Sequence, residues 1–508
     1  MMDGVPPAPL PRTGAAREKL REKGQFWTPD WVTDAMVAWA AEDSDHIFVP
    51  GAGAGAFLRA GKRHASRSGR PLALMGCEID PAVLKSSLGQ GLRPADLERV
   101  ALGDFMTTEF RHRFRAVVAN PPYVRHHRFP AEYKAALRAF GKRLTGQELD
   151  GRAGLHVFFL MKALTLLEDG GRLAFIVPSD TCEGCFAPLL WDWIGRGYRI
   201  ESAVTFAHDA SPFPGVDTNP IVLLISKSPP APTIRWARVL RAGTTELLAW
   251  CGGGLPVGHT GDLEVKERET SEALATGLTR GPATDSPGDT IPFGRLFKVV
   301  RGIATGDNGF FFMTSRRIEE LGLPGDAFLR AIGRTRDHND GPHLTLGHLD
   351  ALDSQGRPTY LLSLGRTTVD ALPPAMQAYL REGEERGLPA RPLIAQRKPW
   401  YRMETRQPPP WLFAYLGRRS CRFIRNVAGA VPLTGFLCVY PRQAAGMDHE
   451  AATKVLNDER TLANLGRVAK SYGGGALKVE PRNLERLAIP LAVMAEHGFG
   501  ATGQDRPS

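Results

Sequence analysis

The sequence HIFVPGAGAGAFL, residues 46–58, passes from a short β-prone run through a glycine-rich turn into a helix expected at 57–68. Other apolar runs that favour strands lie at 72–79, 115–120, 172–177 and 220–226, and a further helix is expected at 156–167. These strands are apolar throughout and alternate with helices, which indicates a mostly parallel sheet covered on both faces. The sequence therefore predicts an α/β domain with a doubly wound, Rossmann-like sheet.

The chain has 508 residues, more than one hydrophobic core usually supports, so two domains are expected. We place the α/β domain at 24–230 and interpret the proline-rich SPPAPT, residues 228–233, as the start of a connecting region at 231–290. Beyond it the alternation is lost, and short β-like pieces mix with loops. Residues 291–493 are therefore expected to form an α+β or β-rich domain, with flexible tails at 1–23 and 494–508.

Composition narrows the functional classes. The sequence has no run of about 18 apolar residues and no apolar segment of the signal-peptide kind, so we expect a cytoplasmic protein without a membrane span. The six cysteines form no regular framework, and the lone CxxC of Cys182 and Cys185 lacks a second ligand pair, so no metal site is expected. The net charge of +10 favours a polyanionic partner.

The glycine-rich turn is the first candidate binding site. Pro50, Gly51, Gly53 and Gly55 follow an expected strand, where glycines let the backbone approach a nucleotide-like ligand closely. No GK[ST] follows in register, so the turn is not a phosphate-binding P-loop. Glu78, 23 residues after Gly55, ends the next strand and could accept both hydroxyls of a ribose. An NAD-binding fold would show the same two features, so they leave the cofactor open.

The tetrapeptide Asn120-Pro121-Pro122-Tyr123 indicates the chemistry. An aromatic amine is a poor nucleophile because its lone pair is delocalised into the ring. The carboxamide oxygen of Asn120 and the carbonyl of Pro121 can accept the two amine protons and direct the lone pair at a methyl group. The prolines keep this backbone rigid, and Tyr123 offers a face on which a base can stack. We therefore expect these four residues to be catalytic.

Asp104 and Phe105 lie in a GDF turn at the end of another expected strand. Asp104 could accept from the amine of a cofactor adenine while Phe105 packs on its ring. An Asp in such a turn is also a common helix cap, so the turn by itself leaves both roles open.

Seven segments, from GQFWTP (residues 24–29) through PGAGAGAFL, EID, GDF, NPPY and LHVFFLMKAL to GGRLAFIVP, resemble in sequence and order the motifs of DNA amino-methyltransferases with the γ motif order. The resemblance implies S-adenosylmethionine as cofactor and the N6 amine of a flipped adenine as target. It implies that Thr28 and Pro29 lie at the methionine end of the cofactor. A further segment, PFPGVDTNPIVLLISK (212–227), resembles the one whose aromatic residue stacks on the flipped base, so the resemblance also implies that Tyr123 and Phe213 stack on the target base. The tetrapeptide alone leaves cytosine N4 open, although NPPY in the γ order favours adenine.

One position departs from the family pattern. The family usually has an acid directly before the Pro-Gly pair, where it serves the methionine end of the cofactor, and this chain has Val49 there. Backbone contacts and the Thr28-Pro29 segment would have to hold that end of the cofactor instead.

The second domain resembles the target-recognition region of restriction-modification adenine methylases, through VRGIATGDNGFFFM (300–313), RKPWYRMET (397–405) and SYGGGALKVEPRNLERLAIP (471–490). Residues 391–425 hold nine basic side chains against one acid, interleaved with aromatic residues, which suits phosphate contacts and base stacking. A solvated basic face over an ordinary core would give the same pattern. The expected DNA-binding residues are Arg397, Lys398, Trp400, Tyr401, Arg418, Arg419, Arg422, Tyr472 and Gly473.

We therefore predict a monomeric, site-specific adenine methyltransferase acting on duplex DNA, the modification component of a restriction-modification or related phage-defence system. A separate restriction endonuclease is a possible partner. Other functions stay open. NPPY also occurs in methyltransferases of RNA and of protein glutamine, although these resemble only the first half of the chain. The missing acid at Val49 would also suit a DNA-binding specificity subunit with weakened catalysis.

Overall fold

The computed structural model describes residues 27–124, 129–214, 219–282, 289–338, 341–414, 416–417, 422–443, 447–468, 470–472 and 476–499. The tail expected at 1–23 lies outside these residues. The chain folds into two compact units, which divide after Pro282 except that Tyr472 is grouped with the first, and each is described by itself.

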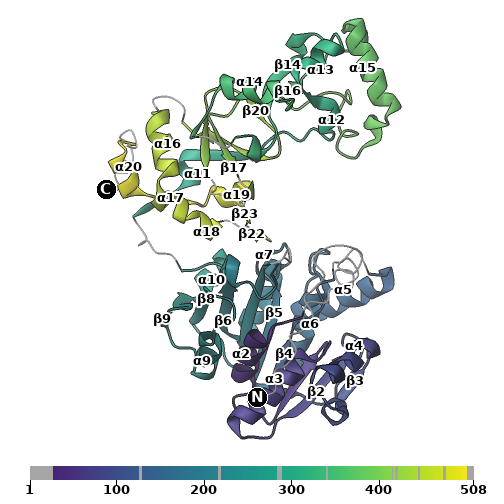
Figure 1. Cartoon of the computed structure of the whole chain (residues 1–508), viewed down its shortest axis with the longest axis vertical. Helices are drawn as coiled ribbons and strands as arrows, with labels where there is room; N and C mark the ends of the chain where they lie inside the picture. The colour runs from purple at the N-terminus through teal and green to yellow at the C-terminus, as the bar shows by residue number, and fades with distance from the viewer. Residues whose placement is uncertain are drawn as a thin grey trace. The chain divides into compact units, whose positions relative to one another are not determined.

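The first unit is built on a ten-stranded sheet in the order β3-β2-β1-β4-β5-β7-β6-β8-β10-β9 (Figure 1). Neighbouring strands from β3 to β5 pair in parallel, whereas β7 is antiparallel to both β5 and β6. The strands expected from the apolar runs are confirmed: β1 (His46–Pro50), β2 (Ala73–Glu78), β4 (Phe114–Ala119), β5 (Leu167–Pro178) and β7 (Pro220–Ser226). The strand expected before the GDF turn is β3 (Val100–Leu102), whereas the runs did not predict β6 (Arg199–Phe206).

Helices cover both faces of this sheet, as the all-apolar strands predict. Side chains along one strand alternate between two cores: Phe48 lies in the first core cluster, with α5, α6 and α8, while Ile47 and Val49 lie in the second, with α2, α3 and α9. This alternation makes each strand apolar on both faces. The helices are α2 (Asp30–Ala40), α3 (Ala56–Ser68), α4 (Pro81–Ser86), α5 (Ala131–Thr145), α6 (Leu155–Thr165), α7 (Asp180–Glu183), α8 (Ala187–Gly197), α9 (Glu246–Gly252) and α10 (Thr270–Thr276).

The expected connecting region at 231–290 is wrong for most of its length. β8 (Thr233–Val239) pairs in parallel with β6, and β10 (Leu263–Glu269) and β9 (Gly258–Thr260) extend the same sheet. These strands lie toward the edge of the sheet and carry charges, such as the ion pair between Arg235 and Glu267, so they lack an all-apolar run. The proline-rich SPPAPT is only the short connection between β7 and β8.

The second unit is an α+β structure with several small sheets, in agreement with the prediction. The largest has the order β12-β21-β17-β19-β15, and a four-stranded sheet has the order β13-β16-β14-β20. The strands are β11 (Thr290–Pro292), β12 (Phe297–Arg301), β13 (Phe312–Met313), β14 (Phe328–Ile332), β15 (His343–Leu344), β16 (Tyr360–Leu362), β17 (Trp411–Ala414), β18 (Leu416–Gly417), β19 (Phe423–Asn426), β20 (Val431–Pro432), β21 (Phe436–Pro441), β22 (Lys470–Tyr472), β23 (Ala476–Lys478) and β24 (Ala488–Pro490).

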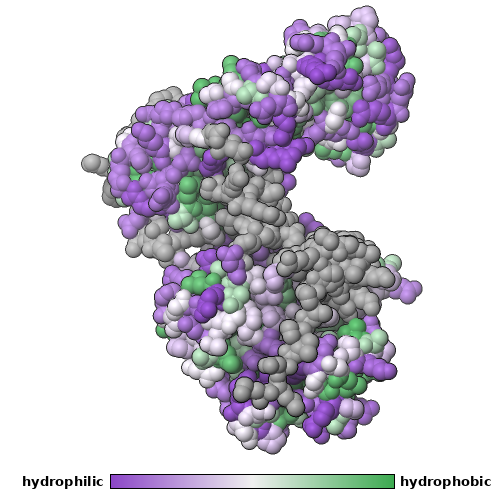
Figure 2. Space-filling view, viewed as in Figure 1, coloured by the Kyte–Doolittle hydropathy of each residue, from purple (hydrophilic) through white to green (hydrophobic). Residues whose placement is uncertain are grey.

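The second unit also contains helices, most of them short. They are α11 (Phe293–Leu296), α12 (Asn308–Phe311), α13 (Ser315–Glu320), α14 (Leu346–Ser354), α15 (Pro374–Glu385), α16 (His449–Asn457), α17 (Glu459–Ala463), α18 (Leu465–Val468), α19 (Pro481–Leu484) and α20 (Leu491–Glu496). α20 replaces the beginning of the tail expected at 494–508, because Met494 and Phe499 are buried in the core beside β12 and β17. The visible face of this unit is largely hydrophilic (Figure 2). No helix in the described part of the chain is both long and apolar enough to cross a membrane.

Candidate active site

The predicted cofactor and catalytic motifs meet at one edge of the first sheet. β1, β2 and β4 run in parallel, with Pro50 opposite Cys77 and Phe48 opposite Val117. Their carboxyl ends therefore lie side by side, and each is followed by a predicted motif: the glycine turn, Glu78 and the NPPY tetrapeptide. The edge of a parallel sheet beyond its strand ends is the usual place for a ligand in this kind of fold.

The glycine turn is shaped by backbone that only glycine adopts readily. Gly51, Gly53 and Gly55 all have positive φ, at 75°, 55° and 81°. A Cβ on Gly55 would come within 2.5 Å of Leu92, so this glycine serves packing. A Cβ on Gly53 would have no atom within 4 Å, so the turn faces open space there. A ligand can approach the backbone at Gly53.

Glu78 is held by three backbone amides. Its Oε2 accepts from Gly53 N at 2.7 Å, and its Oε1 accepts from the N–H groups of Ile79 and Asp80, each at 3.0 Å. The residue is only 6% exposed. A carboxylate has about four acceptor positions, so one remains. Binding both hydroxyls of a ribose would require at least one of these backbone contacts to open.

Ile79 is a residue that the sequence reasoning missed. It directly follows Glu78 and is 67% exposed. Leu102 of β3, which pairs with Glu78 of β2, is a second large apolar residue that is exposed, at 63%. Large apolar side chains exposed at the ligand edge suit the face of an adenine ring. The sequence signal that could have identified Ile79 was an apolar residue directly after the acid that ends a strand.

Phe105 does not have the role predicted for it. The ring is 2% exposed and packs in the first core cluster, with its centroid 4.9 Å from that of Phe159 and the Lys162 ammonium 5.2 Å from its own centroid. A ring covered in this way presents no face to a cofactor, so the predicted contact with adenine is wrong.

Asp104 is observed as a cap of its own turn. Its Oδ1 accepts from Met106 N at 2.9 Å, and its Oδ2 accepts from the Tyr133 hydroxyl at 2.8 Å. Burial and this hydrogen bond both raise the pKa of Tyr133. The structure therefore supports the capping alternative, and contact with an adenine amine stays a prediction.

The NPPY tetrapeptide contacts the predicted Thr28-Pro29 segment. Asn120 Nδ2 donates to Thr28 Oγ1 at 3.0 Å, although the two residues are 92 positions apart. Tyr123 is half-buried, and its hydroxyl donates to the Ile176 carbonyl at 3.2 Å. Burial raises the pKa of the Tyr123 phenol. The phenol is therefore neutral.

The first turn of α6 contacts the tetrapeptide and the residue that follows it. Leu155 N donates to the Val124 carbonyl at 3.0 Å, which ties the loop after Tyr123 to the helix. The next residue, His156, is 9% exposed, and its ring meets that of Tyr123 edge-on at 5.9 Å and 71°. Burial lowers the pKa of His156 to about 4, so the imidazole is neutral.

Phe213, the predicted second stacking residue, is covered. It is 1% exposed and packs in the second core cluster. Residues 215–218, which follow it closely, lie outside the described part of the chain. The stacking surface expected of Phe213 is therefore not present in this structure. The sequence pattern could not show this, because it carries no information on whether a side chain is buried.

Two family matches together span the site and the second unit. Residues 95–213 match the Eco57I restriction-modification methylase family, and residues 283–502 match the C-terminal domain of the Type II methyltransferase M.Eco57I. The chain belongs to the Eco57I-type restriction-modification methylases. These are modification DNA methyltransferases, and the predicted family resemblance is confirmed at this level.

Relatives of this Eco57I-type methylase align along most of its length. The Type II methyltransferase M.AccI of Acinetobacter calcoaceticus is 22% identical over 92% of this chain and 85% of its own. M.XamI of Xanthomonas campestris pv. amaranthicola is 25% identical, with the same two coverages. The solved Type IIL restriction-modification enzyme MmeI in complex with DNA has a similar fold, with a TM-score of 0.53 at 12% identity. The chain covers 63% of that structure, and the match covers 91% of the chain.

In this Eco57I-type methylase, several aromatic residues of the basic stretch, such as Tyr401, lie in the core, whereas Trp400 stays partly exposed and its contact with DNA stays a prediction. Tyr401 is 2% exposed and donates to the Thr367 carbonyl at 2.6 Å, so its expected DNA contact is wrong. Trp400 packs 5.7 Å from Phe310 and donates to Glu384 at 3.1 Å. The interleaving of aromatic and basic residues therefore reflects packing of the domain.

The basic residues predicted to bind DNA differ in whether they already have partners within the protein. Arg397 donates to the Ala304 carbonyl at 2.7 Å, its guanidinium lies over the Phe311 ring, and burial lowers its pKa. Arg422 donates to the His338 carbonyl at 2.8 Å. Lys398 is exposed. Arg418, Arg419 and Gly473 lie outside the described residues, and Tyr472 ends strand β22.

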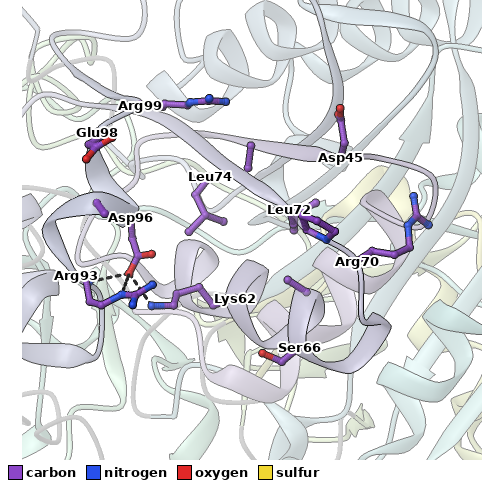
Figure 3. Close-up of a pocket in the computed structure, with 14 residues that line it drawn as sticks. Asp45, Lys62, Ser66, Arg70, Leu72, Leu74, Arg93, Asp96, Glu98 and Arg99 are labelled. Atoms are coloured by element: carbon purple, nitrogen blue, oxygen red, sulfur yellow. Dashed lines mark hydrogen bonds and ion pairs between the residues drawn. The ribbon is translucent and has the colours of Figure 1, made fainter.

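A cavity of about 880 Å³ lies at the other end of the same strands (Figure 3). Its lining includes Asp45, just before β1, and Leu72 and Leu74, where β2 begins. The methylase motifs follow the carboxyl ends of these strands, so this cavity is separate from the candidate active site. Its charges are partly paired, because Asp96 accepts from Lys62 at 2.6 Å.

Proposed function

We propose that this DNA methyltransferase transfers the methyl group of S-adenosylmethionine to the N6 amine of an adenine in duplex DNA. The observation that supports the proposal is the placement of the glycine turn, Glu78 and Asn120 at one edge of a parallel sheet. A nucleoside-binding group and an amide that can bind an amine are thereby brought to neighbouring strand ends.

The residues present fit S-adenosylmethionine. The space at Gly53 lets a ligand come close to the protein backbone, Glu78 is the acceptor for ribose hydroxyls, and Ile79 offers an apolar face for adenine. Thr28 and Pro29 lie beside Asn120, where the methionine end is expected. When bound, this cofactor supplies an electrophilic methyl group on a sulfonium.

The side chains of the protein act on the nucleophile. In the proposed step, Asn120 Oδ1 and the Pro121 carbonyl each accept one N–H of the target amine. Their two hydrogen bonds pull the nitrogen toward a tetrahedral geometry and point its lone pair at the methyl carbon. The neutral Tyr123 ring stacks on the flipped base. The rate gain comes from orientation and from two placed acceptors, so no titrating acid is needed. As the amine nitrogen gains the methyl group it would give up one proton to solvent, and S-adenosylhomocysteine would be the product that leaves.

Val49, which replaces the usual acid, affects the binding of the cofactor rather than the methyl-transfer step. Its side chain is fully buried in the second core cluster, so it offers nothing to the methionine end. Calorimetric titration with S-adenosylmethionine, with and without DNA, separates an active methylase from a subunit that only binds DNA. We expect binding in both titrations, and none in either would contradict the proposal.

Asn120→Ala tests the assignment directly. We expect loss of methylation with DNA binding largely intact, because the variant removes one amine acceptor and leaves the second unit unchanged. Single-turnover methylation and a gel-shift titration measure the two quantities. Near-normal turnover in the variant would refute the catalytic role of Asn120.

The target base and its sequence are read together by methylation-sensitive single-molecule sequencing of DNA from cells that express the protein. We expect N6-methyladenine at one short recognition site, protected from a separate endonuclease of the same specificity. N4-methylcytosine at the site, or methylated RNA with unmodified DNA, would replace the proposed substrate with a different one. Sedimentation of the purified protein tests the expected monomer.

A further inference from the structure

The hydrogen bond between Thr28 and Asn120 links two parts of the site that are distant in sequence. Asn120 Nδ2 donates to Thr28 Oγ1 at 3.0 Å, and Thr28 is only 5% exposed. The bond therefore lies in a largely water-free place, where a hydrogen bond holds geometry more firmly than at the surface.

Thr28 itself is held in place by the start of a buried helix. The next residue, Pro29, caps α2, and its carbonyl accepts from Val32 N at 3.0 Å and from Thr33 N at 3.1 Å. Eight of the eleven residues of α2 are buried, and the helix packs on α3 and α9. The Thr28 hydroxyl is thus attached to a rigid element of the fold.

The direction of this hydrogen bond matters for the chemistry. A carboxamide has one side that accepts and one that donates, and rotation by 180° exchanges them. With Nδ2 directed at Thr28, the acceptor Oδ1 is turned to another side, as binding of an amine N–H requires. The opposite rotamer would present N–H groups to the target amine, and the two donors would repel.

We propose that Thr28 is a positioning residue, which holds the Asn120 amide through Nδ2 in the place where its oxygen can accept from the target amine. This inference rests on the proposed function of Asn120. It assigns to Thr28 a task separate from the cofactor contact that the sequence predicts, because the hydroxyl contacts the catalytic amide itself. Loss of the hydroxyl should therefore slow methyl transfer even when both cofactor and DNA are saturating.

The test compares Thr28→Val, which keeps the shape and removes the hydroxyl, with Thr28→Ser, which keeps the hydroxyl. Thr33→Val is the matched control, since Thr33 is fully buried in α2 and its hydroxyl donates to the Asp30 carbonyl at 3.2 Å. The readout is the single-turnover rate on a duplex with the recognition site, at saturating S-adenosylmethionine and DNA. Calorimetry gives the cofactor Kd of each variant.

We expect Thr28→Val to slow the single-turnover rate roughly 10-fold or more, the scale of one lost hydrogen bond to a positioned group. Thr28→Ser should stay within about 3-fold of wild type, and Thr33→Val should match wild type. Circular dichroism and cofactor binding report whether each variant is folded. If Thr28→Val does not fold, Thr28→Ala takes its place.

Three results would overturn the inference. The Thr28→Val rate could equal that of wild type at every cofactor concentration, it could fall below wild type only when the cofactor is subsaturating, or Thr28→Ser could be as slow as Thr28→Val. Any of these, with Asn120→Ala inactive, leaves the proposed function intact. Full activity of Asn120→Ala would instead remove the proposed function itself.

Discussion

Ile79 lies where a single side chain can change cofactor affinity without changing the fold. It is 67% exposed, so its loss removes little buried area from the folded protein. We expect Ile79→Ser to raise the S-adenosylmethionine Kd roughly 10-fold, because about 1.5 kcal/mol of apolar contact with the adenine ring is lost.

Calorimetry measures this Kd, and Val257→Ser is the control because Val257 is also exposed, at 53%, between α9 and β9. The control should bind the cofactor as wild type does. An unchanged Kd in Ile79→Ser would show that the adenine ring lies elsewhere at the sheet edge.

The contrast between Ile79 and Phe105 shows what a sequence can reveal about a site. The positions of Glu78 and Asn120 were predictable because strand ends can be located from apolar runs. Whether Phe105, Phe213 or Tyr401 is exposed was not, since an aromatic residue beside a motif can point to the ligand or to the core. The contact between Thr28 and Asn120 needs the folded chain, because nothing local joins residues 92 positions apart.

At the level of elements, α6 connects the core of the first unit to the catalytic loop. Its first turn binds the Val124 carbonyl and places His156 against Tyr123. Neither ring nitrogen of His156 has a hydrogen-bond partner among the described residues. A buried imidazole of this kind resists protonation, since burial penalises its charged form.

His156 should therefore make stability depend on pH. Burial lowers its folded-state pKa to about 4, against about 6.5 when unfolded, so the unfolded chain binds the proton first as the pH falls. Between pH 7.5 and 5 this one group should cost about 2 kcal/mol of unfolding free energy. We expect His156→Phe, which keeps a ring against Tyr123, to lose that part of the pH dependence.

Urea unfolding at pH 7.5 and at pH 5 measures the difference, and His112→Phe is the control because His112 is exposed. The control should keep the pH dependence of wild type. Equal pH dependence in wild type and His156→Phe would mean that His156 is accessible to protons in the folded protein.

Elements were predictable to different degrees for a physical reason. β1, β2, β4, β5 and β7 lie between two cores and are apolar on both sides, so their runs stand out. β8 and β10 lie toward the edge of the sheet, and their ion-paired side chains, such as Arg235 and Glu267, hide the strand pattern. The second unit has short strands in several small sheets, so only its mixed class was predictable.

For the whole molecule, net charge is a poor guide to which cations bind DNA. The chain carries a net charge of +10, yet several arginines of the 391–425 stretch hold the fold together. Arg391 pairs with Asp307 at 2.6 Å, and Arg397 holds the Ala304 carbonyl. Such groups have structural partners to give up before they can bind a phosphate.

Lys398 is different, because it is exposed within the same stretch. If it neutralises one DNA phosphate, Lys398→Gln should reduce the slope of log Kd against log salt by about 0.9, and it should weaken binding to specific and non-specific duplexes alike. Fluorescence anisotropy at several salt concentrations measures the slope. Lys227→Gln is the control, since Lys227 pairs with Asp169 at 3.0 Å in the first unit. An unchanged slope in Lys398→Gln would show that Lys398 neutralises no phosphate, and a wild-type affinity that does not vary with salt would argue against the 391–425 stretch as a DNA surface.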